Sequence, residues 1–342
     1  MENGGYTKTI GIIIAGLLAS AMFGQAPALQ NREFHLVHAT TVQDLQELAN
    51  GVRVLSEVRD MSTDNAQMSL EVRGTAEQIG LVEWLVKQLD QPVGGEVPGS
   101  PEYKGLSDTD ENKNAITDGV ARIFYFPLDS TTQEFQETAN AIRTITETRR
   151  VATYNAGKAM MVRGTPAQIG MVEWLAQAMN KPDSPGGEYR VGEDDVMRVL
   201  AVANAASTQD FQEIANTARA IAEIRRVATV NTPHAILIRS TPNQMAMAQW
   251  LVTELDKPGG VQRGQASSEF NTPGSADDQI GVLYVANARS VDFQDVSNAI
   301  RTGAQIRLLI ADTARRAVAV RGTASQIALA ERLVHDLDVP SK

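Results

Sequence analysis

The segment 72–92, VRGTAEQIGLVEWLVKQLDQP, decides the fold because it recurs along the chain. Its copies are VRGTPAQIGMVEWLAQAMNKP at 162–182, IRSTPNQMAMAQWLVTELDKP at 238–258 and VRGTASQIALAERLVHDLDVP at 320–340. Each copy follows a second recurring phrase, which in the first copy is QDLQELAN at 43–50. Phrases that keep their order and nearly their spacing in four copies indicate an array of one repeated structural unit.

The phrase 72–92 predicts a strand followed by a capped helix. Thr75 with Gln78 forms the Thr-x-x-Gln pattern of a capping box, in which each side chain satisfies a backbone N–H of the first helical turn. Pro92 follows the end of the apolar period and is placed where it stops the helix. The same signals occur in the other three copies, so each copy is predicted to close with such a helix.

The residues before this phrase predict the rest of the unit. A short apolar stretch, 34–37 in the first copy, predicts a strand, and the spacing of Leu45, Leu48 and Val52 predicts a helix. Two β-type runs then predict a hairpin, joined in the second copy by the turn residues 155–157. The fold class is therefore predicted as α+β, with tandem β-α-β-β-α modules of KH-like topology. Each module would place two helices on one face of a three-stranded sheet.

The repeats also set the domain boundaries. The four modules are predicted at 32–92, 121–182, 194–258 and 279–340. The Gly/Pro/Ser/Asp-rich segments between them are predicted as linkers at 93–120, 183–193 and 259–278. Because these segments differ in length, we expect separate small domains rather than a tight solenoid. A lone module of this size buries only about 60% of its unfolded surface, so neighbours would stabilise it.

The amino-terminal residues predict the compartment. Lys8 precedes an apolar run from Ile10 to Phe23, and small residues follow near Ala26. A basic flank, a short apolar run and a small-residue site are typical of a secretory signal peptide, predicted here at 1–26. An uncleaved membrane anchor is the alternative. The mature chain is expected to carry no further bilayer-spanning segment. It would cross the inner membrane and reside in the periplasm or at the outer membrane.

Composition and motifs argue against several classes of function. The formal net charge of −10 and the pI near 5.0 disfavour nucleic acid as a partner. The Gly-x-x-Gly loop of a KH site is not found between the helices. Cysteine is absent, and none of the four histidines recurs across the copies. With no phosphate loop, nucleophile elbow or recurring pair of carboxylates, we expect no enzyme, no metal and no cofactor. An enzyme would need a constellation confined to one copy.

Three recurring polar positions are predicted to serve the fold. They are Gln46, Gln136, Gln212 and Gln294 and then Asn50, Asn140, Asn216 and Asn298 on the first helix, and Arg73, Arg163, Arg239 and Arg321 before the second helix. Recurrence within one chain indicates a shared structural task, such as a hydrogen bond between helix and loop.

A helical projection of the second helix predicts an interaction surface. At 100° per residue, Leu81 and Trp84 fall away from the core face formed by Val82, Leu85 and Leu89. The stripe comprises Leu81, Trp84, Met171, Trp174, Met247 and Trp250, with Leu329 and Arg332 at the corresponding positions of the last copy. An exposed tryptophan beside an apolar side chain marks a contact surface, and arginine suits a terminal module facing water. The alternative is that each tryptophan folds onto its own linker.

The modules resemble the secretin N-terminal, NolW-like, short domain, in the Val-Arg-Gly-Thr-x-x-Gln-Ile phrase and the closing Leu-Asp-x-Pro. The resemblance covers all four modules. It is partial at the hairpin, where that family often carries Asp and Asn. It implies the β-α-β-β-α fold and a role in protein–protein contacts of rings in the cell envelope. The long run of alternating strands that a secretin pore requires is not expected in this chain.

Two functions remain open from the sequence. The first is a non-catalytic scaffold of the periplasm or cell envelope, associated with a type II secretion or type IV pilus-like machine. Its partners would be a secretin or another component of that machine, or further copies of itself. The second is binding of a cell-envelope polymer such as peptidoglycan, for which the recurring tryptophan is the candidate contact.

Overall fold

The computed structural model describes residues 28–92, 99–104, 119–180, 187–258, 267–272, 278–287 and 290–338. The predicted signal peptide at 1–26 and large parts of the predicted linkers lie outside these ranges. None of the described helices is long and apolar enough to cross a membrane.

Each repeat forms a strand, a helix, a β-hairpin and a second helix. Module 1 comprises β1 (Gln30–His35), α1 (Val42–Ser56), β2 (Asp60–Asp64), β3 (Ser69–Gly74) and α2 (Ala76–Leu89). Module 2 comprises β5 (Val120–Tyr125), α3 (Thr132–Thr146), β6 (Arg150–Tyr154), β7 (Ala159–Gly164) and α4 (Pro166–Met179). Module 3 comprises β9 (Asp195–Ala201), α5 (Thr208–Ile221), β10 (Arg226–Val230), β11 (Ala235–Ser240) and α6 (Pro242–Leu255). Module 4 comprises β13 (Gln279–Tyr284), α7 (Ser290–Gly303), β14 (Leu308–Asp312), β15 (Ala317–Gly322) and α8 (Ala324–Leu337).

Three further strands lie in segments that the sequence indicated as linkers. They are β4 (Glu102–Lys104), β8 (Tyr189–Gly192) and β12 (Ser268–Asn271). Each pairs antiparallel with the first strand of the module that follows. The first sheet therefore has the expected three strands in the order β1-β3-β2, whereas the other three sheets have a fourth strand at one edge.

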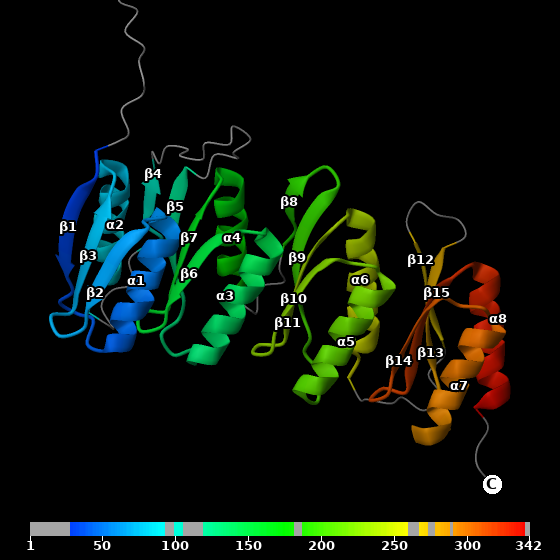
Figure 1. Cartoon of the computed structure of the whole chain (residues 1–342). Coiled ribbons are helices and arrows are strands. Elements are labelled where there is room, and N and C mark those ends of the chain that lie inside the picture. The colour runs from blue at the N-terminus through cyan, green and yellow to red at the C-terminus, as the bar shows by residue number, and fades with distance from the viewer. Residues whose placement is uncertain are drawn as a thin grey trace, which may run out of the picture.

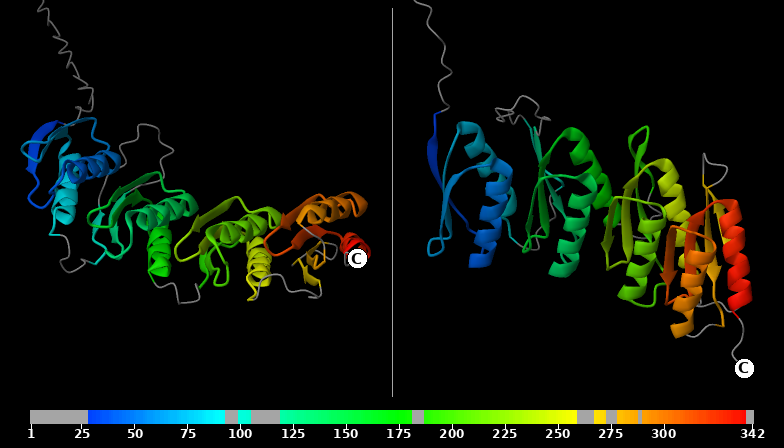
Figure 2. Two further views of the ribbon diagram at one scale, coloured as in Figure 1. Left: turned by 90° about the horizontal axis from the view of Figure 1, so that it is seen from below. Right: turned by 45° about the vertical axis from the view of Figure 1, so that its right-hand side comes forward.

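The modules stack in one row, in which sheets and helical layers alternate (Figure 1). The first helix of each module packs against the hairpin of the next, as α1 does on β6, α3 on β10 and α5 on β14. Figure 2 shows the same succession of layers from two other directions. The helical layer of one module thus covers the outer face of the following sheet. The expectation of separate small domains was wrong, because residues of two modules share each junction's apolar core.

The capping residues place both helices of a module. Thr75 accepts a hydrogen bond from the Gln78 N–H, and the Gln78 side chain accepts one from the Thr75 N–H, so the predicted capping box is confirmed. Gln78 also donates to the Ser56 carbonyl oxygen at 3.1 Å, which ties the start of α2 to the end of α1. The same boxes begin α4, α6 and α8.

The aspartate of the closing Leu-Asp-x-Pro phrase holds the loop after the first strand. Asp90 accepts hydrogen bonds from the N–H groups of Val37, His38 and Ala39 at 2.6, 2.7 and 3.0 Å. Asp256 and Asp338 bind the corresponding loops of modules 3 and 4 in the same way. In modules 1, 3 and 4 this aspartate therefore closes the module by joining its last helix to its first loop; module 2 has Asn180 at this position.

Candidate functional site

The tryptophans of the predicted stripe lie at the junctions between modules. Trp84 on α2 contacts Tyr103 on β4, with 5.6 Å between the ring centroids. The corresponding pairs, at 5.7 and 5.4 Å, are Trp174–Tyr189 and Trp250–Phe270. The aromatic partner thus comes from a segment indicated as a linker, and that segment is an edge strand of the next sheet. Binding of a separate protein by this stripe stays a prediction.

The apolar companions of the tryptophans differ between the inner modules and the last one. Leu81, Met171 and Met247 are buried. In module 4 no described strand or helix covers these positions: Leu329 is 39% exposed, and Arg332 is exposed as well. The structure therefore brings six of the eight predicted residues into junctions and leaves the last pair on an open end.

The edge strand and the second helix approach closely at each junction. A Cβ added to Gly80 would lie 3.0 Å from the Tyr103 hydroxyl. A Cβ added to Gly170 would lie at the same distance from the Tyr189 hydroxyl. At the third junction Ala246 occupies the glycine position and Phe270, which has no hydroxyl, occupies the tyrosine position. Helix residue and ring therefore change together from one junction to the next.

A second contact at each junction joins the first helix to the next hairpin. Glu47 on α1 accepts hydrogen bonds from the Asn155 N–H at 2.7 Å and from the Asn155 amide Nδ2 at 2.6 Å. Glu137 accepts from the same two groups of Asn231 at 3.1 and 3.2 Å. Burial tends to raise the pKa of Glu137, but hydrogen bonds from Gln133 and Asn231 outweigh it and hold that pKa below its usual range.

The recurring arginines also act across the junctions. Arg163 donates to the Leu55 carbonyl oxygen at the end of α1, at 2.9 Å, and lies 3.7 Å from the Glu57 carboxylate. A cation at a helix carboxyl terminus satisfies unpaired carbonyls and complements the helix dipole. Arg239 and Arg321 reach Ile145 and Ile221 in the same way. The predicted bond between helix and loop within one module is found instead for Gln46, which donates to Thr63 and Asn65.

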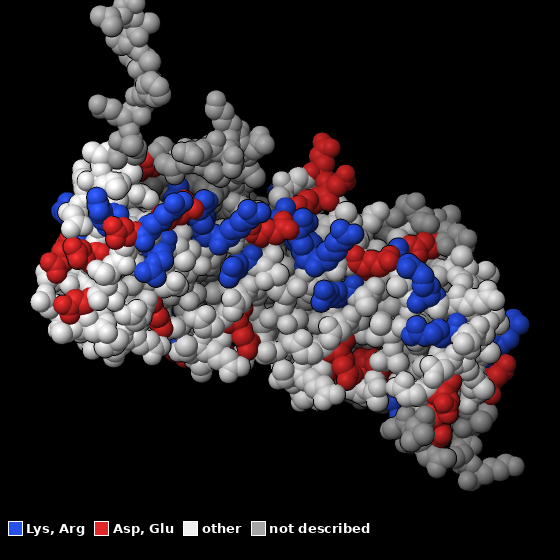
Figure 3. All heavy atoms as spheres, in the orientation of Figure 1, with Lys and Arg blue, Asp and Glu red and all other residues white. Residues whose placement is uncertain are grey.

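A glutamate in the left-handed conformation ends each inner first helix and binds the next module. Glu57 has a φ of 56°, and its carboxylate lies 2.8 Å from the Arg150 guanidinium of module 2. The equivalent pairs are Arg226–Glu147 at 2.9 Å and Arg307–Glu223 at 3.2 Å. Figure 3 shows the result as a band of alternating basic and acidic side chains that crosses the junctions.

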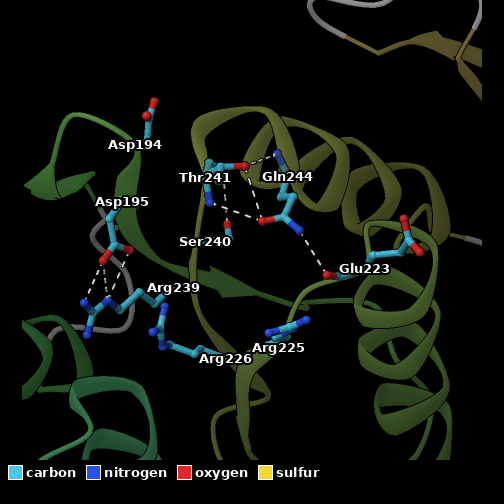
Figure 4. A pocket seen from close by; sticks show the side chains of 9 residues that line it. All are labelled: Asp194, Asp195, Glu223, Arg225, Arg226, Arg239, Ser240, Thr241 and Gln244. Atoms are coloured by element: carbon cyan, nitrogen blue, oxygen red, sulfur yellow. Dashed lines mark hydrogen bonds and ion pairs between the residues drawn. The ribbon is translucent and has the colours of Figure 1, made fainter.

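The corner of module 3 shows how these groups are arranged (Figure 4). Gln244 at the start of α6 donates to the Glu223 carbonyl oxygen at the end of α5, at 3.0 Å. Arg239 is held by Asp195 of its own module, with an N···O distance of 2.6 Å. Arg321 is held likewise by Asp278, and this hydrogen bond lowers the pKa of Asp278. Carboxylates of their own modules thus hold Arg239 and Arg321 in position for their contacts with the preceding helix.

The third junction uses a different buried cation. Arg315 on the hairpin of module 4 pairs with Asp210 on α5 and with Asp312 of its own module. Its Nε also donates to the Leu255 carbonyl oxygen at the end of α6. Burial raises the pKa of Asp312. Since Thr313 stands where Asn155 and Asn231 stand, this arginine takes the place of the Glu–Asn contact.

The sheet face of module 1 that points away from its own helices is polar. Glu71 stands where modules 2, 3 and 4 carry Met161, Leu237 and Ala319. A polar hollow of about 520 Å³ opens on this face. The lining residues are Glu33, Ser62, Thr63, Asp64, Asn65, Ala66, Ser69 and Glu71. No described module covers this face, so its side chains meet water.

The opposite end of the array lacks the acidic group of the inner junctions. Gln305, with a φ of 53°, ends the first helix of module 4 where Glu57, Glu147 and Glu223 end the others. Leu329 and Leu337 are exposed on α8. The two ends of the array are thus unlike each other and unlike the surfaces that meet inside it.

A tyrosine hydroxyl also joins the first two modules. The Tyr125 hydroxyl donates to the Gln88 carbonyl oxygen at 3.1 Å across the first junction, and burial raises the pKa of Tyr125 to about 12. Within the described ranges, no three His, Cys, Asp or Glu side chains are grouped so that they could hold a metal ion. The histidines His35, His38, His234 and His335 lie in different surroundings.

Comparisons with known proteins give remote likenesses. No family model and no curated protein matches the chain. Among solved structures, the N-terminal domain of the secretin XcpQ from Pseudomonas aeruginosa is 16% identical, with a TM-score of 0.20, over 60% of this chain and 94% of that one. ExeD of Aeromonas hydrophila is 11% identical, with a TM-score of 0.16, over 87% of this chain and 60% of that one.

A third solved structure, the type II secretion system secretin GspD of E. coli K12, is also 11% identical. Its TM-score is 0.16, over 87% of this chain and 58% of that one. At such TM-scores the likenesses carry no argument about function. The function must be argued from the junctions and the two ends of the array.

Proposed function

We propose that the chain is a non-catalytic scaffold of the periplasm or cell envelope that binds protein modules of its own fold. The observation that supports this proposal is the use of one surface, the α-helical layer of a module, to bind the sheet of the next module at every inner junction. A surface that binds such a sheet three times within the chain is suited to bind one from another protein.

The open surface of this kind lies on module 4. Leu329 and Arg332 occupy the positions that Met247 and Trp250 occupy on α6, where they meet β12 of the next sheet. The partner that fits is a sheet face edged by a strand, such as a secretin N-domain or a pilus component of the same fold. Arg332 adds a positive charge where the inner junctions have an indole, so a partner with an acidic side chain at that edge is favoured.

The compartment follows from the sequence features rather than from the fold. The signal-type segment at 1–26 supports export across the inner membrane, and the resemblance to secretin N-domains supports a place beside an envelope secretion machine. The set of recurring residues supports a role without catalysis, since caps, core positions and junction contacts account for it.

Site-specific photo-crosslinking in cells tests the proposal. A photoreactive residue at position 332 is expected to form an adduct with an envelope protein that carries a β-α-β-β-α module. Position 50 on α1 is the control, because Asn50 is exposed but lies far from the open end. Equal adducts at both positions, or adducts with proteins of unrelated fold alone, would contradict the proposal.

Sedimentation with purified sacculi separates this function from peptidoglycan binding. The scaffold is expected to stay in the supernatant. If it instead sediments with sacculi, and Leu329→Asp releases it, the polymer is the partner and the protein-binding proposal fails. The substitution replaces a side chain that is already 39% exposed, so the fold should tolerate it.

A further inference from the structure

Among the described residues, the outer edge of strand β1 in module 1 has no partner strand, whereas the same edge is paired in every other module. Strands β4, β8 and β12 pair with β5, β9 and β13 and complete four-stranded sheets. Among the described residues, no strand pairs with the corresponding side of β1. The three paired edges therefore show which contacts a strand makes when it is added at this position.

The added strands carry a glutamate at a fixed place. Glu102 on β4 lies opposite Arg122 on β5, and their side chains approach to 3.7 Å. Glu188, directly before β8, lies 3.2 Å from Arg198 on β9. Glu269 on β12 lies opposite Gly281, so this partner arginine is lost only in module 4. The filled edges of modules 2 and 3 thus pair a strand glutamate with a sheet arginine.

Module 1 has this arginine without the strand glutamate. Arg32 on β1 lies opposite Val72, the same register that Arg122 has with Val162. Like Arg122 over Phe124, it lies over a ring, that of Phe34, at 6.0 Å. Among the described residues it forms an ion pair with Glu83, at 3.6 Å.

Arg32 is more exposed than the equivalent arginines because no described strand covers it. The Arg32 side chain is 52% exposed, against 18% for Arg122 and 28% for Arg198. The backbone is open in the same place. In module 2 the Ile123 N–H donates outward to the Pro101 carbonyl oxygen at 3.1 Å. Glu33 is the equivalent residue of β1, and its N–H has no hydrogen-bond partner among the described residues.

We infer that the edge of β1 receives an extended segment of a partner protein, antiparallel to β1, with a glutamate opposite Arg32. Main-chain hydrogen bonds would supply affinity, and the Arg32–glutamate pair would set the register, as in other cases of strand addition. The inference goes beyond the proposed scaffold function and does not depend on the surface at Leu329 and Arg332, because it concerns the other end of the array.

A second copy of this chain does not satisfy the site through its own β1. In an antiparallel pair, directly opposite residues point to the same face of the sheet. The positions of β1 that share the face of Arg32 are Gln30 and Phe34, and neither is acidic. The charged side chains along β1 also oppose pairing of two identical edges. A strand of different sequence is therefore the occupant that fits.

A peptide that copies the chain's own edge strand tests the inference. The probe is a labelled peptide with the sequence of residues 98–105, PGSPEYKG, added to the full-length mature protein. We expect saturable binding at up to millimolar peptide, with slower hydrogen exchange at the Glu33 amide. The variant Arg32→Ala, and a peptide with glutamine in place of its glutamate, are each expected to bind at least tenfold more weakly.

Matched controls keep the test sharp. Arg198→Ala removes the equivalent arginine of module 3, where the edge is already filled, and should leave peptide binding unchanged. Arg32 is exposed, so its substitution should not impair folding, which a thermal unfolding curve checks. Absence of binding, equal binding by Arg32→Ala, or an already protected Glu33 amide in the protein alone would each overturn the inference.

Discussion

Arg73 and Arg163 occupy the same place in their modules but have different surroundings. Arg163 is 7% exposed at its side chain and caps the end of α1, whereas Arg73 is 57% exposed and lies 3.8 Å from Asp60 of its own module. The difference arises because no described helix precedes module 1 and offers its carboxyl end to Arg73. The same residue type thus supports a junction in one copy and serves only the surface in another.

Substitution of these two arginines should therefore differ in cost. We expect Arg163→Ala to lower the free energy of unfolding by about 1–3 kcal/mol, because the Leu55 carbonyl and Glu57 lose a charged partner. Arg73→Ala should change it by less than about 0.5 kcal/mol, as for other exposed ion pairs. Urea unfolding followed by tryptophan fluorescence measures both variants. Equal losses would show that Arg163 does not support the junction.

Carboxylates at the second and third junctions make stability depend on pH. The pKa values of Glu137 and Asp278 are held below their usual 4.5 and 3.8, so these groups stabilise the folded chain above those values. This contribution is lost as the pH falls through the lowered folded-state pKa values. We expect the urea concentration at the midpoint of unfolding to decrease as the pH is lowered from about 5 to about 3. Glu137→Gln should flatten this decline, and an unchanged pH profile would contradict the assignment.

At the scale of elements, each second helix and the following edge strand are matched in size. Gly80 leaves room for the Tyr103 hydroxyl, and at the third junction Ala246 and Phe270 occupy the corresponding positions. A similar match occurs between the first helix and the next sheet, where a Cβ on Gly51 would lie 2.5 Å from the Met161 sulfur. The junctions therefore differ in detail although the modules share one fold.

A double-mutant cycle tests the match at the first junction. Alanine normally stabilises a helix by about 1 kcal/mol relative to glycine. We expect Gly80→Ala to give no such gain in the native background, because the new methyl group crowds the Tyr103 hydroxyl. In a Tyr103→Phe background the same substitution should stabilise by about 0.5–1 kcal/mol. The same gain in both backgrounds, measured by urea unfolding, would refute the proposed crowding.

The sequence predicts the elements better than their assembly. Apolar spacing, capping boxes and the closing proline are local signals, so strands and helices followed from them. The junctions depend on contacts between residues far apart in sequence, such as Glu57 with Arg150, which no local pattern reveals. One signal was present: β3 reads SLEV at 69–72 with alternating polarity, whereas β7 reads AMMV at 159–162. A strand that is apolar on both faces is buried on both faces.

The candidate site could be predicted only in part for a similar reason. The helical projection found that Trp84 points away from its own core, which is a property of one helix. What covers it depends on Tyr103, in a Gly/Pro/Ser-rich segment whose composition favours a linker. Three residues of strand, Glu102–Lys104, are too few to show a period. The open edge of β1 became visible only when the four sheets could be compared.

At the scale of the whole molecule, the two ends disfavour head-to-tail stacking of one copy of the chain on another. Glu71 and the other polar groups cover the sheet face of module 1, and Gln305 removes the acidic partner at the end of module 4. Head-to-tail association of two copies would bury these polar groups without the ion pairs that the inner junctions have. We expect the native chain to be a monomer in this respect.

Replacing the end residues should create the missing junction. The variant Asp60→Arg, Glu71→Met and Gln305→Glu restores at each end the residue type found inside the array. Light scattering is expected to show that its mass rises with concentration, while the native chain stays monomeric. Changes at one end only, Asp60→Arg with Glu71→Met, serve as the control. Native chains that already form head-to-tail oligomers would contradict the role of the polar ends.

The alternation of layers also gives the array an order of synthesis. A growing chain presents module 1 first, and its polar outer sheet face needs no cover. Each later module brings an apolar sheet face whose cover, the helical layer before it, has already been made. Removal of module 1 would therefore expose the apolar sheet face of module 2. Removal of module 4 would instead expose the helical layer of module 3. The modules can therefore fold one after another, each apolar sheet face covered as it forms, only in the order from module 1 to module 4.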